Sequence, residues 1–124
     1  MESKVKKKIL VVDDSKPNLL ILNSILKQDY VVLAARNGSE ALERARLFTP
    51  DLILLDIIMP EMDGFEVVAQ LKSSSETRDI PVIFITGLSE PDDITKGMSL
   101  GAVDYITKPF DAEDVRKRVQ NHLS

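Results

Sequence analysis

The sequence contains no cysteine, which excludes disulfides, thiol catalysis and cysteine-ligated zinc. It has a single histidine, His122, and no apolar run approaches the roughly 20 residues that a membrane-spanning helix needs. The formal net charge of -4 gives no reason to expect nucleic acid or an anionic membrane as the main partner. These absences are compatible with a cytoplasmic protein, and we expect that location.

What is present is sufficient for one domain with a substantial core. The chain has 124 residues, of which 44% are hydrophobic and 29% charged, and no linker, repeat or low-complexity tract divides it. Residues 1–8, MESKVKKK, are basic but are not followed by a long apolar region or a small-residue cleavage site. We therefore predict a single domain over 1–124 that begins with a solvated leader, 1–8.

Five short apolar runs are spaced along the chain. They are ILVV at 9–12, VVLAA at 31–35, LILL at 52–55, VIFI at 82–85 and AVDYI at 102–106. The first, third and fourth runs do not alternate with polar residues, which indicates strands of a parallel sheet covered on both faces. The connecting segments of 16 to 26 residues are too long for hairpins and fit crossover helices.

Each connector, and the segment after the fifth run, carries a helical pattern. The apolar stripes are Leu19, Leu22 and Leu26; Ala41, Leu42, Ala45 and Phe48; Phe65, Val68 and Leu71; Ile94 and Met98; and Val115, Val119 and Leu123. Candidate start signals are Pro17, Asn37 or Ser39, Asp63 and Asp111. Five β-α units with right-handed crossovers predict an α/β doubly wound sheet, with a loose polar loop at 73–79.

Chemically active side chains follow four of the five predicted strands. Asp13 and Asp14 come after the first run and Asp56 after the third, while Thr86 and Lys108 follow the fourth and fifth. In open α/β sheets the ligand crevice lies outside the carboxyl ends of the strands. We therefore expect three carboxylates, one hydroxyl and one ammonium to converge on a single edge of the sheet.

Three clustered carboxylates repel one another, so the group is unfavourable unless a cation lies among them. Mg²⁺ is a suitable cation, because it binds one or two carboxylates, keeps some water and leaves room for a phosphate oxygen. Lys108 adds a compact positive charge that can pair with Asp56 at rest and with a phosphate later. Aspartate is a covalent carrier of phosphoryl groups, and in-line attack on phosphorus needs a fixed nucleophile. Asp56 is therefore the predicted phosphoryl acceptor.

Four segments and their spacing form one specific pattern. They are VVDDS at 11–15, LLDIIMPEMDG at 54–64, FITG at 84–87 and GAVDYITKPF at 101–110. On these segments the sequence resembles a response-regulator receiver domain of two-component signalling, over nearly its whole length. The resemblance implies a flavodoxin-like (βα)5 three-layer sandwich whose five-stranded parallel sheet has the order 2-1-3-4-5.

The resemblance also implies a role for each residue of the expected site. Asp56 matches the phosphoacceptor of the family and Asp14 a direct Mg²⁺ ligand. Asp13 matches a carboxylate that acts through a metal-bound water. The backbone carbonyl of Ile58 would complete the protein's share of the metal ligands.

Three further matches concern the response to phosphorylation. Thr86 matches the hydroxyl that moves toward the phosphoryl group, and Lys108 matches the lysine that bonds one of its oxygens. Tyr105 matches the aromatic switch that turns inward when Thr86 moves. The Lys108–Pro109 bond is expected to be cis, as in the family. Phosphorylation would then alter the surface formed by the fourth helix, fifth strand and fifth helix.

The resemblance implies partners as well. A histidine kinase or phosphotransfer protein would supply the donor histidine, so His122 is expected to be structural, and a downstream effector domain or protein would receive the signal. We expect no separate enzymatic substrate, only Mg²⁺-dependent self-phosphorylation and autodephosphorylation, with homodimerisation on activation as one outcome. Ile58 and Leu88 match positions that influence the phosphoryl lifetime in the family. Their apolar side chains cannot orient an attacking water, so slow hydrolysis of the acyl phosphate is expected. The carboxyl-terminal sequence, GAVDYITKPF followed by RKRVQNHLS, resembles receivers fused to cyclic-dinucleotide enzymes or sensor kinases. We therefore expect a fragment of a larger multidomain regulator.

Three other interpretations of these residues are open. Asp13 and Asp14 can cap the first helix, a role compatible with metal binding through other oxygens. Phosphatases of the haloacid-dehalogenase type share aspartyl-phosphate chemistry, but they place two aspartates one residue apart after the first strand, and here that position is Ser15. A phosphate-independent receiver-like binding module is the third, although every reactive position is filled.

Overall fold

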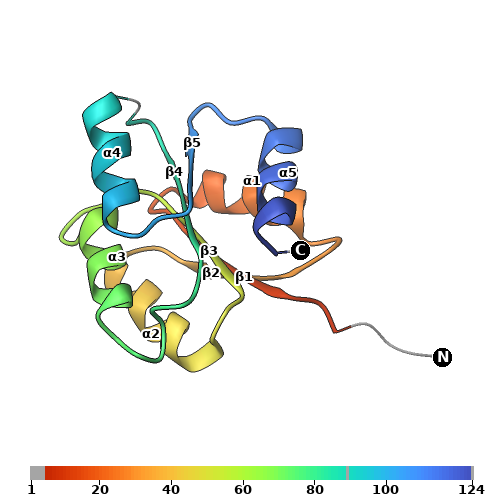
Figure 1. Ribbon diagram of the computed structural model, residues 1–124. Helices are drawn as coiled ribbons and strands as arrows, with labels where there is room; N and C mark the ends of the chain where they lie inside the picture. The colour runs from red at the N-terminus through yellow and green to blue at the C-terminus, as the bar shows by residue number, and fades with distance from the viewer. Residues whose placement is uncertain (1–4, 89, 124) are drawn as a thin grey trace.

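The computed structural model describes residues 5–88 and 90–123, in which five strands alternate with five helices (Figure 1). The strands are β1 (Lys8–Val12), β2 (Val31–Ala35), β3 (Leu52–Leu55), β4 (Val82–Thr86) and β5 (Asp104–Thr107). The helices are α1 (Lys16–Leu26), α2 (Gly38–Phe48), α3 (Gly64–Lys72), α4 (Pro91–Ser99) and α5 (Ala112–Leu123). No helix in these described ranges is long and apolar enough to cross a membrane.

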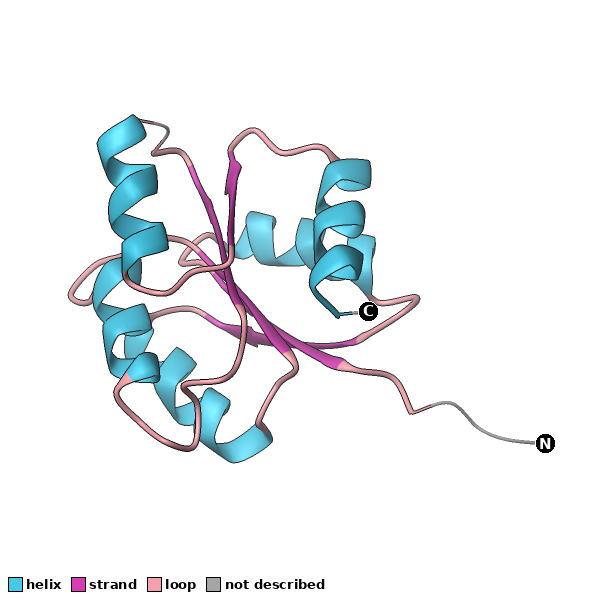
Figure 2. Ribbon diagram, viewed as in Figure 1, coloured by secondary structure: helices cyan, strands magenta, loops and turns pink. Residues whose placement is uncertain are grey.

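The strands form one parallel sheet in the order β2-β1-β3-β4-β5. Helices α1 and α5 cover one face of the sheet, and α2, α3 and α4 cover the other, which gives three layers (Figure 2). The predicted α/β doubly wound fold and its strand order are thereby confirmed. Because all strands run in the same direction, their carboxyl ends meet at one edge.

The central strands are apolar throughout because both of their faces are covered. In β1, Leu10 and Val12 belong to the core beneath α2 and α3, whereas Ile9 and Val11 belong to the core beneath α1 and α5. None of these four side chains is more than 1% exposed. Burial of each contributes about 1.5–3 kcal/mol, so the strand is a rigid base for the residues that follow it.

Side-chain caps begin three of the helices where the sequence predicted them. Asn37, Asp63 and Asp111 each accept the backbone N–H of the residue three positions later, at 2.8, 2.9 and 3.2 Å. Each bond satisfies one N–H of the first helical turn, which has no partner within the helix. The caps fix where α2, α3 and α5 leave the sheet.

The start of helix α1 does not use Asp13 or Asp14 as its N-cap, which was one of the open interpretations. Its N-cap is Ser15, whose Oγ accepts the N–H of Asn18 at 3.4 Å, and Pro17 lies in the first turn as predicted. Neither Asp13 nor Asp14 is therefore the N-cap residue of α1. Ser15 also stands where the phosphatase interpretation required an aspartate, and its hydroxyl serves the helix start.

Strand β5 begins later than predicted, at residue 104 rather than 102. Gly101 adopts φ 115°, and the N–H of Ala102 donates to the Gly97 carbonyl at 3.2 Å, so these residues close the end of α4. A left-handed glycine after the last turn is a common helix ending. Hydrophobicity alone did not reveal this, because Ala102 is buried there as it would be in a strand.

The segment 73–79 is not the loose loop that its polar sequence predicted. Thr77 is only 2% exposed, and its hydroxyl donates to the Leu71 carbonyl at 2.7 Å. The Lys72 ammonium donates to the backbone carbonyls of Arg78 and Ile80, at 2.9 and 3.1 Å. These bonds hold the α3–β4 connection against the domain.

The end of the predicted amino-terminal leader is hydrogen-bonded to the domain rather than only solvated. Lys8 is the first residue of β1, and its ammonium donates to the Phe48 carbonyl at 2.6 Å. The Lys7 ammonium donates to the Leu123 carbonyl at 2.7 Å. The rest of the predicted leader includes residues 1–4, which lie outside the described residues.

Candidate functional site: an acidic crevice at the carboxyl edge of the sheet

The predicted site residues are brought to one edge of the sheet by the parallel strands. Asp13 and Asp14 directly follow β1, Asp56 directly follows β3, Thr86 ends β4 and Lys108 directly follows β5. Register places these strand ends side by side, because β1 pairs with β3, β3 with β4 and β4 with β5. Residues far apart in the sequence thus become neighbours.

The three aspartates form one cluster of carboxylates. An oxygen from each of Asp13, Asp14 and Asp56 lies within 4.8 Å of the others. Asp13 and Asp56 are buried, at 0% and 4% exposure, whereas Asp14 is exposed. Oxygens at this spacing suit a hard divalent cation such as Mg²⁺, which takes carboxylate oxygens, backbone carbonyls and water as ligands.

Lys108 lies between the two buried carboxylates. Its Nζ donates to Asp13 Oδ2 and to Asp56 Oδ2, both at 2.9 Å. Burial lowers the pKa of this ammonium, but the hydrogen bonds and negative charges of the two aspartates outweigh that effect, so the pKa is raised above its ordinary value. Lys108 is therefore charged and offsets part of the repulsion within the cluster. The Lys108–Pro109 bond is cis, which confirms that prediction.

Asp13 is held in place by the start of α1. Its Oδ1 accepts the backbone N–H of Ser15 at 2.9 Å, and its Oδ2 accepts a hydrogen bond from the Asn18 amide at 3.3 Å. Asn18 was not among the site residues predicted from the sequence. Its position one turn into a helix that begins directly after the acidic pair is the signal that could have indicated it.

The connection between β3 and α3 folds back closely on Asp56. The N–H of Ile58 donates to Asp56 Oδ1 at 3.2 Å, and the N–H of Gly64 donates to the Ile57 carbonyl at 2.8 Å. A side chain at Gly64 would collide with the Asp56 carbonyl, so the close approach of α3 requires glycine. This explains the glycine that ends the segment at 54–64.

Thr86 and Tyr105 both contact the backbone of Leu88. Thr86 is 0% exposed, and its Oγ1 accepts the Leu88 N–H at 3.5 Å, while the Tyr105 hydroxyl donates to the Leu88 carbonyl. Burial, followed by the negative charges of Asp93 and Asp56, raises the pKa of Tyr105 above its ordinary value. The phenol is therefore neutral and available as a donor at neutral pH.

Comparison with known proteins decides the family. Residues 9–120 match the family model of the response regulator receiver domain. The chain belongs to this family.

Two curated proteins and one solved structure are similar to this chain. A probable cyclic di-GMP phosphodiesterase of Vibrio cholerae is 49% identical over 115 residues, which are 93% of this chain and 26% of that protein. PilH of Pseudomonas aeruginosa is 41% identical, over 94% of this chain and 98% of PilH. The structure of the Vibrio cholerae chemotaxis protein CheY4 shares 32% identity with a TM-score of 0.91, over 96% of this chain and all of that one. The receiver domain thus spans about a quarter of the first relative.

The receiver domain also contains an aromatic row that the sequence analysis did not identify. Phe84 of β4 lies edge-to-face between Phe65 and Tyr105, with ring centroids 5.7 and 6.0 Å apart. Gly97 of α4 lies directly over it, and a Cβ added there would be 2.7 Å from the Phe84 ring. The row connects the side chain of Tyr105 to α4.

The histidine of the receiver domain lies apart from the acidic cluster. His122 Nε2 is 3.1 Å from Asp104 Oδ2, and Arg118 donates to Asp104 Oδ1 at 2.7 Å. This contact agrees with the prediction that His122 is structural. Asp104, which joins β5 to α5 through both partners, was not identified from the sequence.

Proposed function

We propose that this receiver domain is a signalling switch that takes a phosphoryl group on Asp56. The observation that carries the proposal is the position of Asp56, buried at the end of a central strand, within the acidic cluster and 2.9 Å from the Lys108 ammonium. In the transfer, an Asp56 oxygen forms a bond to phosphorus while the bond from phosphorus to the donor nitrogen breaks. The donor imidazole keeps that electron pair, and the phosphoryl group remains as an acyl phosphate.

We propose Mg²⁺ as the cofactor. Asp14, Asp56 and the backbone carbonyl of Ile58 would be direct ligands, and Asp13 would act through a metal-bound water. The exclusively oxygen donor set and the 4.8 Å grouping of the carboxylates support this choice over a softer metal. When bound, the ion supplies positive charge beside the negatively charged phosphoryl oxygens.

Lys108 and Thr86 are the remaining site residues in the proposal. Once Asp56 carries a phosphoryl group, the Lys108 ammonium would bond one of its oxygens, because the ammonium already lies against the same carboxylate. The Thr86 hydroxyl would turn toward the phosphoryl group. Its present contact, the 3.5 Å bond from the Leu88 N–H, is weak and therefore easily exchanged.

The conformational response would pass through Leu88. Movement of Thr86 removes the acceptor of the Leu88 N–H, while the Leu88 carbonyl accepts from Tyr105. A change in one contact therefore bears on the other, and Tyr105 rests on the aromatic row beneath α4. The α4-β5-α5 face is thus the proposed output surface, where an effector or a second copy would bind.

We propose that the phosphoryl group is lost slowly. The Ile58 side chain is apolar and 57% exposed, and Leu88 packs against the core, so neither can orient an attacking water. Timing the loss of phosphate from the purified protein tests this. Substitution Ile58→Asn should shorten the lifetime, and an unchanged or longer lifetime would count against the explanation.

A histidine kinase or phosphotransfer protein is the proposed donor. Beside Lys108 a hollow of about 250 Å³ is lined by Asn18, Ile21, Pro109 and Phe110. Ile21 is 48% exposed, which is high for an isoleucine, and it provides apolar surface next to the site. A donor that docks here would bring its phosphohistidine toward Asp56.

The wider setting is also part of the proposal. We propose a cytoplasmic receiver domain comprising 1–124 that belongs to a larger regulator and controls an effector. The 26% coverage of the phosphodiesterase relative supports such an arrangement, whereas the 98% coverage of PilH fits a receiver domain that occurs alone. The domain itself would carry out only its own phosphorylation and dephosphorylation.

Phosphoryl uptake tests the central proposal. Purified protein incubated with a small phosphodonor and Mg²⁺ should incorporate one phosphoryl group, and a chelator should abolish incorporation. Asp56→Asn should incorporate none, whereas the matched control Asp29→Asn, at an exposed position in the α1–β2 turn, should behave as wild type. Failure of the wild type to incorporate phosphate would favour the phosphate-independent binding module.

A further inference from the structure

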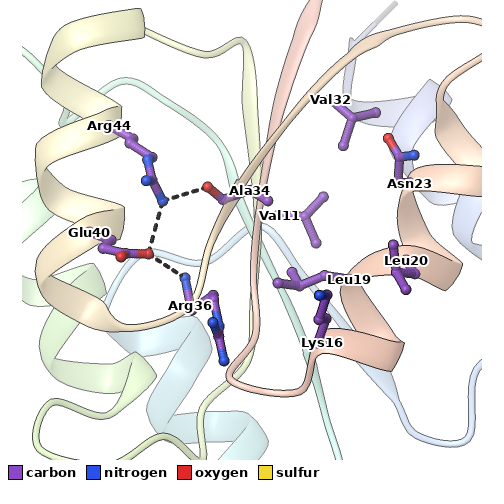
Figure 3. A pocket seen from close by; sticks show the side chains of 10 residues that line it. All are labelled: Val11, Lys16, Leu19, Leu20, Asn23, Val32, Ala34, Arg36, Glu40 and Arg44. Carbon is purple, nitrogen blue, oxygen red and sulfur yellow. Dashed lines mark hydrogen bonds and ion pairs between the residues drawn. The ribbon is translucent and has the colours of Figure 1, made fainter.

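The outer edge of β2 forms a groove that the phosphoryl chemistry does not use. Within the described residues β2 pairs with β1 alone, so its other edge faces outward between α1 and α2. A cavity of about 400 Å³ opens there, with apolar side chains that include Leu19, Leu20 and Val32 (Figure 3). An unpaired sheet edge presents backbone donors and acceptors that can bind another strand.

One half of this edge is closed by two side chains of α2. Glu40 Oε1 accepts the Arg36 backbone N–H at 2.9 Å, and Arg44 Nη1 donates to the Ala34 carbonyl at 2.7 Å. The two side chains also pair with each other at 2.9 Å (Figure 3). They thus make the hydrogen bonds that a neighbouring strand would make at the carboxyl half of β2.

The amino half of the edge is not covered in this way. Because backbone groups alternate in direction along a strand, Val32 presents its N–H and C=O outward, as does Ala34, whereas the Ala35 carbonyl points to β1 and accepts the Asp13 N–H. Among the described side chains, none donates to the Val32 carbonyl. The outward N–H of Ala34 and the carbonyl of Val32 are spaced as a donor and an acceptor for one extended segment.

The charge around the groove indicates what kind of segment fits. Three cations line it, Lys16, Arg36 and Arg44, against one anion, Glu40, whereas the whole chain carries -4. Arg44 and Glu40 offset each other, which leaves an excess of two positive charges among the residues that line the groove. One of the two, Arg36, also lines a neighbouring hollow with Asp14 and Glu61. A second copy of the chain would place this excess against itself, so an acidic partner is electrostatically favoured. Leu20, which is 60% exposed, adds an apolar wall.

We propose that the amino half of the β2 edge binds a short extended acidic segment of a partner protein as an additional strand. The segment would exchange backbone hydrogen bonds with Val32 and Ala34, place apolar side chains against Leu19 and Leu20, and direct carboxylates toward Lys16 and Arg36. This surface is separate from the α4-β5-α5 face, because β2 and β5 are opposite edges of the sheet. Its carboxyl end reaches the acidic crevice, because Arg36 also lines a hollow with Asp14.

The test uses the capped hexapeptide Val-Ser-Glu-Ser-Glu-Ser, whose valine and glutamates share one face of an extended strand. It is titrated into the isotope-labelled 124-residue protein and followed by amide chemical shifts. Saturable shifts are expected at the backbone amides of Val32 and Ala34. Lys16→Glu with Arg36→Glu should weaken binding about tenfold, because two attractions are replaced by repulsions. The matched control, Arg116→Glu with Lys117→Glu on the exposed face of α5, should leave the affinity unchanged.

Two further peptides make the result specific. The same hexapeptide N-methylated at alternate amides cannot donate to a strand and should not bind, and its lysine-for-glutamate analogue should bind more weakly. The proposal is overturned if the acidic hexapeptide gives no saturable shift at β2, or if the N-methylated form binds equally well. A further outcome also overturns the proposal. If the same shifts appear without peptide when the protein concentration is raised, and the molecular mass in solution doubles, the β2 edge binds a second copy of the chain instead.

Discussion

Lys108 stabilises the acidic crevice before any phosphoryl group arrives. Its ammonium is bonded to Asp13 and Asp56, whose side chains are only 1% and 6% exposed. Two buried carboxylates without this partner would be left with unfavourable desolvation and mutual repulsion. The sequence predicted the pairing with Asp56, but not the one with Asp13, because only the folded geometry shows that one ammonium can reach both.

Replacement of Lys108 by methionine should therefore destabilise the fold. Loss of one partner from a largely buried charge cluster costs about 3 kcal/mol, and solvent around the partly exposed lysine will reduce that value. Urea unfolding measures the change, and Mg²⁺ should restore more stability to Lys108→Met than it adds to the wild type. The control Lys117→Met, at an exposed position, should have little effect. Equal stability of Lys108→Met and wild type in the absence of Mg²⁺ would contradict this account.

Tyr105 provides a prediction about pH. Its pKa is raised by burial and then by the charges of Asp93 and Asp56. A folded pKa above the unfolded value of about 10 favours the neutral phenol, so this contribution to stability is complete below about pH 10 and is lost as the pH rises through the folded pKa. In Tyr30→Phe, where Tyr105 is the remaining tyrosine, ultraviolet titration should give a midpoint above that of free tyrosine. A midpoint at or below the free value would be inconsistent with the described contacts.

Among the elements, α4 is the helix whose position the sequence explains least. Its apolar pattern is short, and Gly97 is the only buried residue among the described residues of this helix. The helix approaches the sheet closely because Gly97 has no side chain to separate it from the Phe84 ring. Periodicity identifies apolar stripes, but it does not show that a glycine fits against a particular aromatic ring. The contact became visible only in the structure.

Gly97→Ala should therefore destabilise the domain although alanine favours helices. Overpacking against a buried ring costs about 1–3 kcal/mol, and the gain in helix propensity returns about 1 kcal/mol, so a net loss of about 1 kcal/mol is expected. The unfolding midpoint in urea measures it. Gly87→Ala is the control, because an added Cβ there would meet nothing within 4 Å. A stabilised Gly97→Ala protein would show that α4 is free to move away from Phe84.

The elements that the sequence predicted well are those with strong local signals. Continuous apolar runs indicated β1, β3 and β4, and the caps Asn37 and Asp63 indicated where α2 and α3 begin. The weaker predictions failed where tertiary contacts decide. The start of β5 and the order of segment 73–79 depend on hydrogen bonds between α4, α3 and the turns that follow them.

At the scale of the whole molecule, the site was predictable because its residues follow strands of one parallel sheet. Once Asp13, Asp56 and Lys108 were each assigned to a strand end, the topology required them to meet. Residues such as Asn18 and Phe84 carry no such signal, since they reach the site or its surroundings through helix geometry and packing. The distribution of charge is likewise a property of the folded molecule, in which three carboxylates gather in the acidic crevice and three cations line the groove at the β2 edge.

The most direct measurement is the location of the phosphoryl group. After incubation with a small phosphodonor and Mg²⁺, borohydride reduction converts an acyl phosphate of aspartate into homoserine, which peptide mass spectrometry can place in the sequence. Homoserine is expected at position 56 alone, and none is expected when Mg²⁺ is removed by a chelator. Homoserine at position 13 or 14, or a phosphoryl group on His122 or Thr86 with Asp56 unmodified, would contradict it.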